Sequence, residues 1–176
     1  MNEIIKRNGI TYGIVLGIFS MLVTTLIYVI DLSLFTSMWV GIVSLIIFLI
    51  IGIILLIKTK KDFNGIISFK EAFTTFFLAA AIGSTISVLY NILLFNVIDP
   101  EAKTIVNDMM IKYSVDMMEK FGAPASSINE AVAEMRKVDN YSPFSLLKGL
   151  MFSLVFSAIL GLILALIFKS KPAYKE

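Results

Sequence analysis

The stretch from residue 34 to residue 57, LFTSMWVGIVSLIIFLIIGIILLI, contains no charged residue and is followed by Lys58, Lys60 and Lys61. A helix needs about 20 consecutive apolar residues to cross the hydrocarbon core of a bilayer. Trp39 suits the interface at the beginning of this stretch, and the lysines close its other end. The stretch is therefore predicted to be a membrane-spanning helix.

Three further segments have the same character, at residues 10–30, 69–98 and 144–168. A cleaved signal peptide is the alternative for the first of them. Its apolar run is longer than a typical signal core, however, and no small-residue cleavage site follows. Over the chain, 58% of residues are hydrophobic and 16% are charged, whereas soluble domains contain about 25% charged residues. We therefore expect an all-α fold, with residues 1–176 forming a single membrane domain built on a four-helix bundle.

Two of the spans begin with recognisable helix caps. Ser68-Phe69-Lys70-Glu71 has the spacing of a capping box, in which the serine accepts from a backbone N–H and the glutamate reaches back to the cap. The fourth span follows a serine and a proline at 142–143, a cap with proline at the first helical position. Both caps predict where a span begins.

Lysine and arginine gather on one side of the predicted bundle. This side holds Lys6, Arg7, Lys58, Lys60, Lys61, Lys70, Lys169, Lys171 and Lys175. The opposite segment, 99–143, holds five basic residues against eight acidic ones. Because cytoplasmic flanks are enriched in Lys and Arg, both termini are predicted to be cytoplasmic and 99–143 extracytoplasmic. The loop lysines Lys58, Lys60 and Lys61 are also expected to face anionic lipid.

Residues 99–142 are predicted to form an outer hairpin of two amphipathic helices. The first helix should begin with Asp99 as its cap and end at Gly122, and Ser127 with Glu130 should cap the second. We expect the apolar stripes of the hairpin to cover each other and the outer end of the bundle. Interfacial lipid and a second subunit are the alternative partners of these stripes.

Small residues recur at every fourth position on three of the spans, which lets helix backbones approach closely. These rows are Gly9, Gly13 and Gly17; Ala79, Gly83 and Ser87; and Gly149, Ser153, Ser157 and Gly161. Packing within one chain is the simpler interpretation. Contact between two copies is the alternative, with the row on the fourth span as the favoured interface.

Polar residues inside the membrane are frequent markers of a transport path, and here they concentrate on the third span. Ser84, Ser87 and Asn91 lie near one helical face, and none of them is charged. Lys148 is an ionisable residue near the edge of a span. We expect it to extend toward the interface, with pairing to Asp31 or Asp99 as the alternative.

The chain contains no His and no Cys, which removes imidazole bases, thiolate nucleophiles and the usual zinc ligands. Its serines have no histidine partner, so no catalytic residue is assigned. The methionines are expected to fill an adaptable core, with Cu(I) binding through thioethers as the alternative. We therefore expect no cofactor and no bound metal. A net charge of +2 is too small to indicate nucleic-acid binding.

The inner loop and the start of the third span, GIISFKEAF at residues 65–73, resemble the signature of an uncharacterised bacterial family. That family is a domain of unknown function found in small four-span membrane proteins. The glycine-rich first span and the Gly/Ser-rich fourth span resemble it as well. The resemblance implies an inner-membrane location in a bacterium with two membranes. It also implies a role beyond capping for Ser68, Phe69, Lys70 and Glu71, and it carries no activity.

The pattern favours a non-enzymatic accessory or interaction component of the membrane. Its expected partners are the lipid bilayer, a second copy of the chain and a protein that contacts the outer hairpin. The alternative function is a small transporter or channel subunit that uses the polar face of the third span. A four-span monomer offers little room for a pore, so this alternative is expected to require an oligomer.

Overall fold

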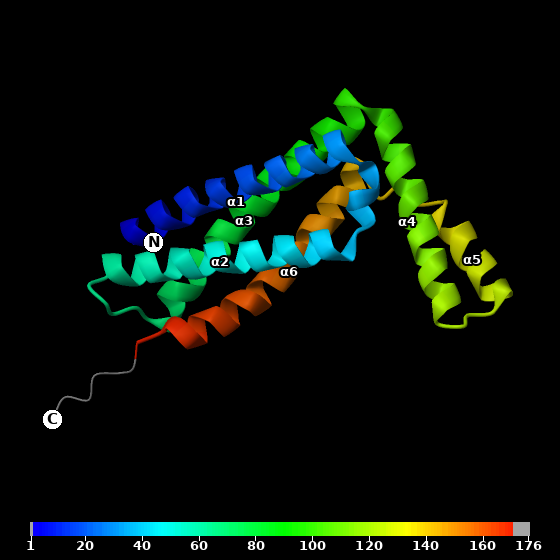
Figure 1. Ribbon diagram of the computed structural model, residues 1–176. Helices are drawn as coiled ribbons and strands as arrows, with labels where there is room; N and C mark the ends of the chain where they lie inside the picture. Colours follow the sequence, from blue (N-terminus) through cyan, green and yellow to red (C-terminus); the bar gives the residue numbers. More distant parts are fainter. Residues whose placement is uncertain (1, 171–176) are drawn as a thin grey trace.

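Residues 2–170 are described by a computed structural model, and its regular structure in this range is entirely helical (Figure 1). The four long helices are α1 (Glu3–Ile30), α2 (Met38–Asp62), α3 (Phe69–Leu93) and α6 (Pro143–Phe168). The hairpin consists of α4 (Pro100–Lys120) and α5 (Ala125–Met135). Helices α1, α2 and α6 are each long and apolar enough to cross a membrane, and so is α3 together with the turn that follows it. The predicted all-α membrane bundle with a helical hairpin is confirmed.

The two ends of the bundle differ in character. The first residues of α1, the loop between α2 and α3 and the end of α6 lie together at what we call the basic end, and α4 and α5 lie at the opposite, hairpin end (Figure 1). The Lys60 ammonium donates to the carbonyl of Phe168 at 3.2 Å, and the Ile67 N–H donates to the Ser170 hydroxyl at 3.0 Å. These bonds tie the end of α2 and the following loop to the end of α6. Lys171 and Lys175, also counted on this side, lie outside the described residues.

Helices α1 and α3 pack through their small residues. A Cβ on Gly13 would lie 2.7 Å from the Cβ of Ile82, and a Cβ on Gly83 would lie 2.7 Å from the Cβ of Leu16. The backbones are therefore as close as glycine allows, and van der Waals contact holds the pair together. The other members of the two rows are Gly9, Gly17, Ala79 and Ser87. Both rows are used within one chain.

The core of the basic end is built around Phe76, which is 1% exposed. Its ring is flanked by Gly52 of α2 and Gly161 of α6, where a Cβ would come within 2.5 Å and 3.0 Å of it. Ser157 of α6 is also buried, but a Cβ on Gly149 would meet nothing within 4 Å. The row on α6 is thus packed in its second half and open in its first half.

The predicted caps at Ser68 and at Ser142 are confirmed. The Ser68 side chain accepts from the Glu71 N–H, and the Glu71 carboxylate accepts from the Ser68 N–H at 2.8 Å. The Ser142 hydroxyl accepts from the Ser145 N–H at 3.2 Å. The cap predicted at Ser127 is wrong. Helix α5 begins at Ala125, directly after Pro124, and the Pro124 carbonyl already accepts the first helical bond.

The starts of the first two spans also differ from the prediction, whereas the third span ends at Ile98 as predicted. Helix α1 begins at Glu3 because the Asn2 side chain caps it by accepting the Ile4 N–H at 2.8 Å. Helix α2 begins only at Met38, since residues Leu32–Thr36 form a short 3₁₀ turn. The third span ends in a π-helical turn, Leu94–Ile98. Hydropathy marks the membrane-embedded part of a helix and does not locate its polar ends.

The hairpin buries less of its apolar surface than expected. Ala102 and Val106 of α4 are buried against Phe95, at the hairpin end of the bundle. Further from the bundle, Phe121 is 83% exposed, and α5 has no buried residue. The base of the hairpin is therefore packed on the bundle, and its tip is not.

The substitution Gly13→Val tests the α1–α3 contact. The new side chain would overlap Ile82, and overpacking of this kind costs about 1–3 kcal/mol. Thermal unfolding of the purified protein in detergent should therefore show a lower midpoint. Gly41→Val is the matched control, because a Cβ on Gly41 meets nothing within 4 Å. Equal midpoints for the two variants would contradict the proposed importance of this contact.

Candidate functional site

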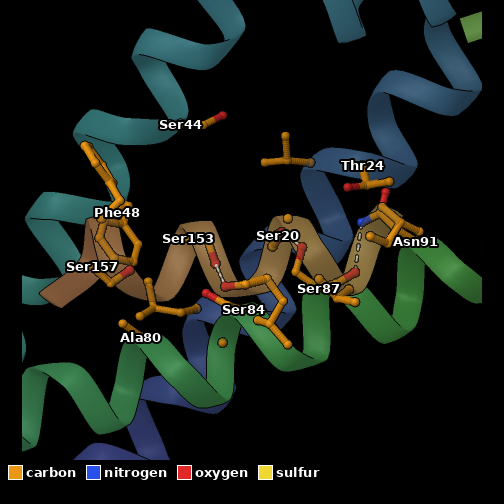
Figure 2. A pocket seen from close by; sticks show the side chains of 18 of the residues that line it. Ser20, Thr24, Ser44, Phe48, Ala80, Ser84, Ser87, Asn91, Ser153 and Ser157 are labelled. Carbon is orange, nitrogen blue, oxygen red and sulfur yellow. Dashed lines mark hydrogen bonds between the residues drawn. The ribbon is translucent and has the colours of Figure 1, made fainter. Parts of the chain in front are cut away.

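A cavity of about 700 Å³ lies between the four long helices, in the half of the bundle nearest the hairpin (Figure 2). The three residues singled out on the third span, Ser84, Ser87 and Asn91, all line it. Gly149 and Ser153, from the open half of the α6 row, line the facing wall. Cavities of a few hundred to about 1,000 Å³ are typical of small-molecule sites. The monomer alone thus contains a ligand-sized space.

Each of the four spans contributes one unpaired hydroxyl to this cavity. They belong to Thr24 of α1, Ser44 of α2, Ser84 of α3 and Ser157 of α6 (Figure 2). None of the four makes a side-chain hydrogen bond to another group in residues 2–170, and none of these oxygens is sealed off from the cavity space. The convergence of the four is visible only once the helices are placed.

Other polar groups on the cavity wall already have partners, one of them in a neighbouring helix and the others in their own helix. The hydroxyls of Ser20 on α1 and Ser87 on α3 lie 2.7 Å apart and share a hydrogen bond. The Asn91 amide donates to the Ser87 carbonyl at 2.8 Å, and the Ser153 hydroxyl donates to the Leu150 carbonyl at 2.9 Å. Of the predicted polar path, Ser84 is therefore the member whose hydroxyl is left for a guest molecule.

No charged residue lines the cavity in the part of the chain that the structure describes. The remaining wall is apolar, with residues such as Phe19, Val23 and Leu150. A charged guest placed there would lose its hydration without gaining a partner of opposite charge, which is costly in a medium of low polarity. The lining is therefore suited to an uncharged ligand that has hydrogen-bonding groups.

The cavity is closed toward the basic end. The rings of Phe48 and Phe76 meet edge to face there, with their centroids 5.8 Å apart. Phe76 is in turn clamped between Gly52 and Gly161. The polar face of α3 consequently leads into a blind cavity and not through the bundle.

The rim of the cavity is joined to the hairpin. Asn140 lines the cavity, and its N–H donates to the Asn107 side chain of α4 at 3.3 Å. Asp139 accepts from Asn107 at 3.1 Å and pairs with Lys103 at 2.9 Å. Although burial opposes it, the hydrogen bonds from Lys103 and Asn107 hold the pKa of Asp139 below its usual range.

A second joint fixes the hairpin to α1. Asp99 caps α4 as predicted, accepting from the N–H groups of Glu101 and Ala102 at 3.1 Å and 3.0 Å. It also accepts from the Tyr28 hydroxyl at 2.8 Å. The backbone N–H of Ala102 and the Tyr28 hydroxyl hold the pKa of Asp99 below its usual range. Beside this joint, Tyr141 packs on Phe95 with ring centroids 4.4 Å apart, and burial raises its pKa to about 12.

Lys148 does not pair with Asp31 or Asp99. Its ammonium lies over the ring of Phe144, 4.4 Å from the centroid, at the start of α6. Asp31 instead caps the 3₁₀ turn by accepting the Ser33 N–H at 2.8 Å. The extension of Lys148 toward the interface stays a prediction.

A polar cluster at the basic end was missed by the sequence analysis. The Asn8 amide of α1 is buried and donates to Thr59 at 3.2 Å and to Asp62 at 2.9 Å, both on α2. Arg7 and Lys58 also pair with Asp62, at 3.1 Å and 3.3 Å. Every group here has a partner, so the cluster is a structural clamp between α1 and α2. The signal in the sequence was an asparagine facing the core one turn after the start of a span.

The clamp changes the interpretation of the loop lysines. Lys58 is paired with Asp62 and Lys60 with the carbonyl of Phe168, whereas Lys61 and Lys70 are exposed. Two of the lysines expected to face lipid are thus engaged within the protein. In residues 2–170, no three acidic side chains come together as a metal site would require.

Acid should loosen the joint at Asp99. Because the folded state lowers the pKa of this carboxyl, its stabilising effect is fully present above about pH 4, the unfolded value, and is lost as the pH falls through the folded pKa. After correction for the intrinsic pH dependence of amide exchange, the protection of the first turn of α4 should decrease over this range. Asp99→Asn should raise exchange at pH 7 and reduce its acid dependence, with the remainder due to Asp139. Asp116→Asn, further along α4, is the control and should behave as wild type.

One family model matches the chain over most of its length. No curated protein and no solved structure matches it. The family model described as "Protein of unknown function (DUF4199)" matches residues 11–170, which include the hairpin, the cavity and nearly all of the four spans. The chain belongs to the DUF4199 family, a domain of unknown function whose match here covers a four-span membrane bundle.

Proposed function

We propose that the protein is a non-enzymatic accessory component of the inner membrane that holds a small uncharged ligand in its cavity. One observation carries the proposal: four spans each direct an unpaired hydroxyl into one cavity whose described lining has no charge. Thr24, Ser44, Ser84 and Ser157 are the ligand-contacting groups in this proposal.

The chain could have satisfied these hydroxyls internally. A serine or threonine in a helix can donate to a carbonyl in the preceding turn, and Thr25, Thr85 and Ser153 do so. An unpaired hydroxyl within a bilayer has no bulk water to bind and costs free energy. Four such groups around one ligand-sized space support a role in binding a guest.

The same lining supports a function other than catalysis. A serine or threonine nucleophile requires a neighbouring base, and among residues 2–170 none of those that line the cavity is ionisable. Hydrogen-bond donors and acceptors remain, and these groups bind and orient a ligand. We therefore propose a binding site and not an active site.

A transporter or channel subunit is the second candidate, and the position of the α3 polar face on the cavity wall favours it. The contact between Phe48 and Phe76 closes this path. Transport therefore requires a state in which Phe76 leaves the space between Gly52 and Gly161. In this second candidate function, two copies of the chain would associate through the exposed surfaces of their spans.

We further propose that both termini are cytoplasmic and that residues 99–143 are extracytoplasmic. The basic end carries most of the positive charge next to the spans, and the hairpin lies at the opposite end. The exposed hairpin tip, with Phe121, then offers a contact surface for a protein partner outside the membrane. Lys61 and Lys70 would face anionic lipid on the inner side. Nucleic acid is not a proposed partner.

Ser84→Leu should abolish ligand retention. The leucine removes one hydroxyl and fills part of the cavity, whereas Thr85→Leu, one residue away, alters an exposed residue. Mass spectrometry of small molecules released from protein in nanodiscs should show an uncharged species with wild type and Thr85→Leu, and none with Ser84→Leu. Equal retention by both variants would overturn the binding proposal. Glycerol flux into proteoliposomes that is blocked only by Ser84→Leu would favour transport.

The absence of cysteine makes a test of topology direct. Asp116→Cys on the hairpin and Lys61→Cys in the inner loop place single thiols at opposite ends. In spheroplasts, a membrane-impermeant maleimide should label the first variant and should label the second only after the membrane is opened. The reverse pattern would contradict the proposed orientation.

A further inference from the structure

The cavity has an opening in its side, between α2 and α6. Leu45 of α2 and Phe156 of α6 both line the cavity, yet they are 41% and 52% exposed. Residues that belong to the wall and are also exposed mark the place where the wall is incomplete. The first half of α6 leaves this gap, since a Cβ on Gly149 meets no neighbouring atom within 4 Å.

The opening leads into the bilayer and not into water. The outer surfaces of the two helices beside it are apolar and exposed, with Ile46 on α2 and Phe152 on α6 at 49% and 78%. Spans with such surfaces are surrounded by lipid. A molecule that passes between α2 and α6 therefore comes from the hydrocarbon layer.

We propose that the ligand is a neutral amphiphile of the bilayer, with an uncharged hydroxylated headgroup and a single acyl chain, which enters sideways between α2 and α6. This inference rests on the binding function proposed above. The headgroup exchanges hydrogen bonds with Ser84 and any of the other lining hydroxyls within its reach, and the chain lies in the gap beside Leu45 and Phe156.

The chemistry of the wall selects this class over other lipids. A phosphate or carboxylate headgroup needs a cation, and the lining supplies none; Lys58, Lys60 and Lys61 lie at the far end of the bundle. A hydrocarbon without a headgroup would leave the four hydroxyls unpaired. A hydroxylated headgroup on a chain offers hydrogen bonds to hydroxyls of the lining such as Ser84, and its chain fills the apolar gap.

The test compares three probes on the purified full-length protein after removal of lipid. Monooleoylglycerol has the proposed headgroup and chain, oleate has the chain with a charged headgroup, and glycerol has the headgroup alone. Native mass spectrometry should show monooleoylglycerol bound to the wild-type protein. Oleate and glycerol should neither bind comparably nor displace it.

Two glycine variants place the binding in the cavity. A Cβ on Gly149 meets no neighbouring atom, so Gly149→Leu extends a side chain toward the gap and should weaken monooleoylglycerol binding by at least about tenfold. Gly41→Leu introduces the same side chain on α2, outside the cavity lining, and should bind as wild type does. Ser84→Ala, which removes one hydroxyl and keeps the space, should weaken binding by about threefold to tenfold.

Each contrary result identifies what has failed. Glycerol that binds or displaces monooleoylglycerol overturns entry from the bilayer and leaves the binding function intact. Comparable oleate binding overturns the neutral headgroup. Equal binding of monooleoylglycerol by Gly149→Leu and wild type overturns this inference alone. So does a lack of monooleoylglycerol binding while Ser84 still controls retention of another uncharged species. If the wild-type protein neither binds monooleoylglycerol nor retains an uncharged species in a way that depends on Ser84, the proposed function is overturned as well.

Discussion

The close contact of α1 with α3 is the interaction on which the rest of the structure depends. Inside a bilayer the hydrophobic effect does not drive helices together, so association relies on van der Waals contact and short hydrogen bonds. Gly13 and Gly83 let the two backbones approach, and the Ser20–Ser87 hydrogen bond continues the same seam. With one side of α3 occupied by α1, helix α6 packs on another, and the space between the four spans follows from this arrangement.

The space between the four spans is filled at one end of the bundle and empty toward the other. Toward the basic end, Phe76 fills it and is clamped by Gly52 and Gly161. Two turns later on the same helix, Ser84 stands where a large side chain would be needed to close it. The change from an aromatic ring to a hydroxyl divides the bundle into a solid half and a hollow half. The proposed binding function belongs to the hollow half.

The base of the hairpin is attached to the rim of the cavity. Its base is fixed by Asp99 to Tyr28 and by Asn107 to the chain at Asp139 and Asn140, and Asn140 is part of the cavity rim. A displacement of the cavity rim would therefore move the base of α4. The exposed tip of the hairpin then offers a surface on which a partner could sense that change, which links the binding and interaction roles proposed for this protein.

The sequence by itself determined the four spans, the basic and hairpin ends and most of the caps, because each depends on local composition and spacing. Ser68 with Glu71, and Asp99 before Pro100, were identified in this way. It did not determine the clamp at Asp62, the start of α5 or the convergence of Thr24, Ser44, Ser84 and Ser157. The physical reason is that lipid-facing and protein-facing sides of a span are both apolar, so the sequence carries little information about which way a helix is turned. Only the packing of the spans against one another decided which small polar side chains meet and where space remains between them.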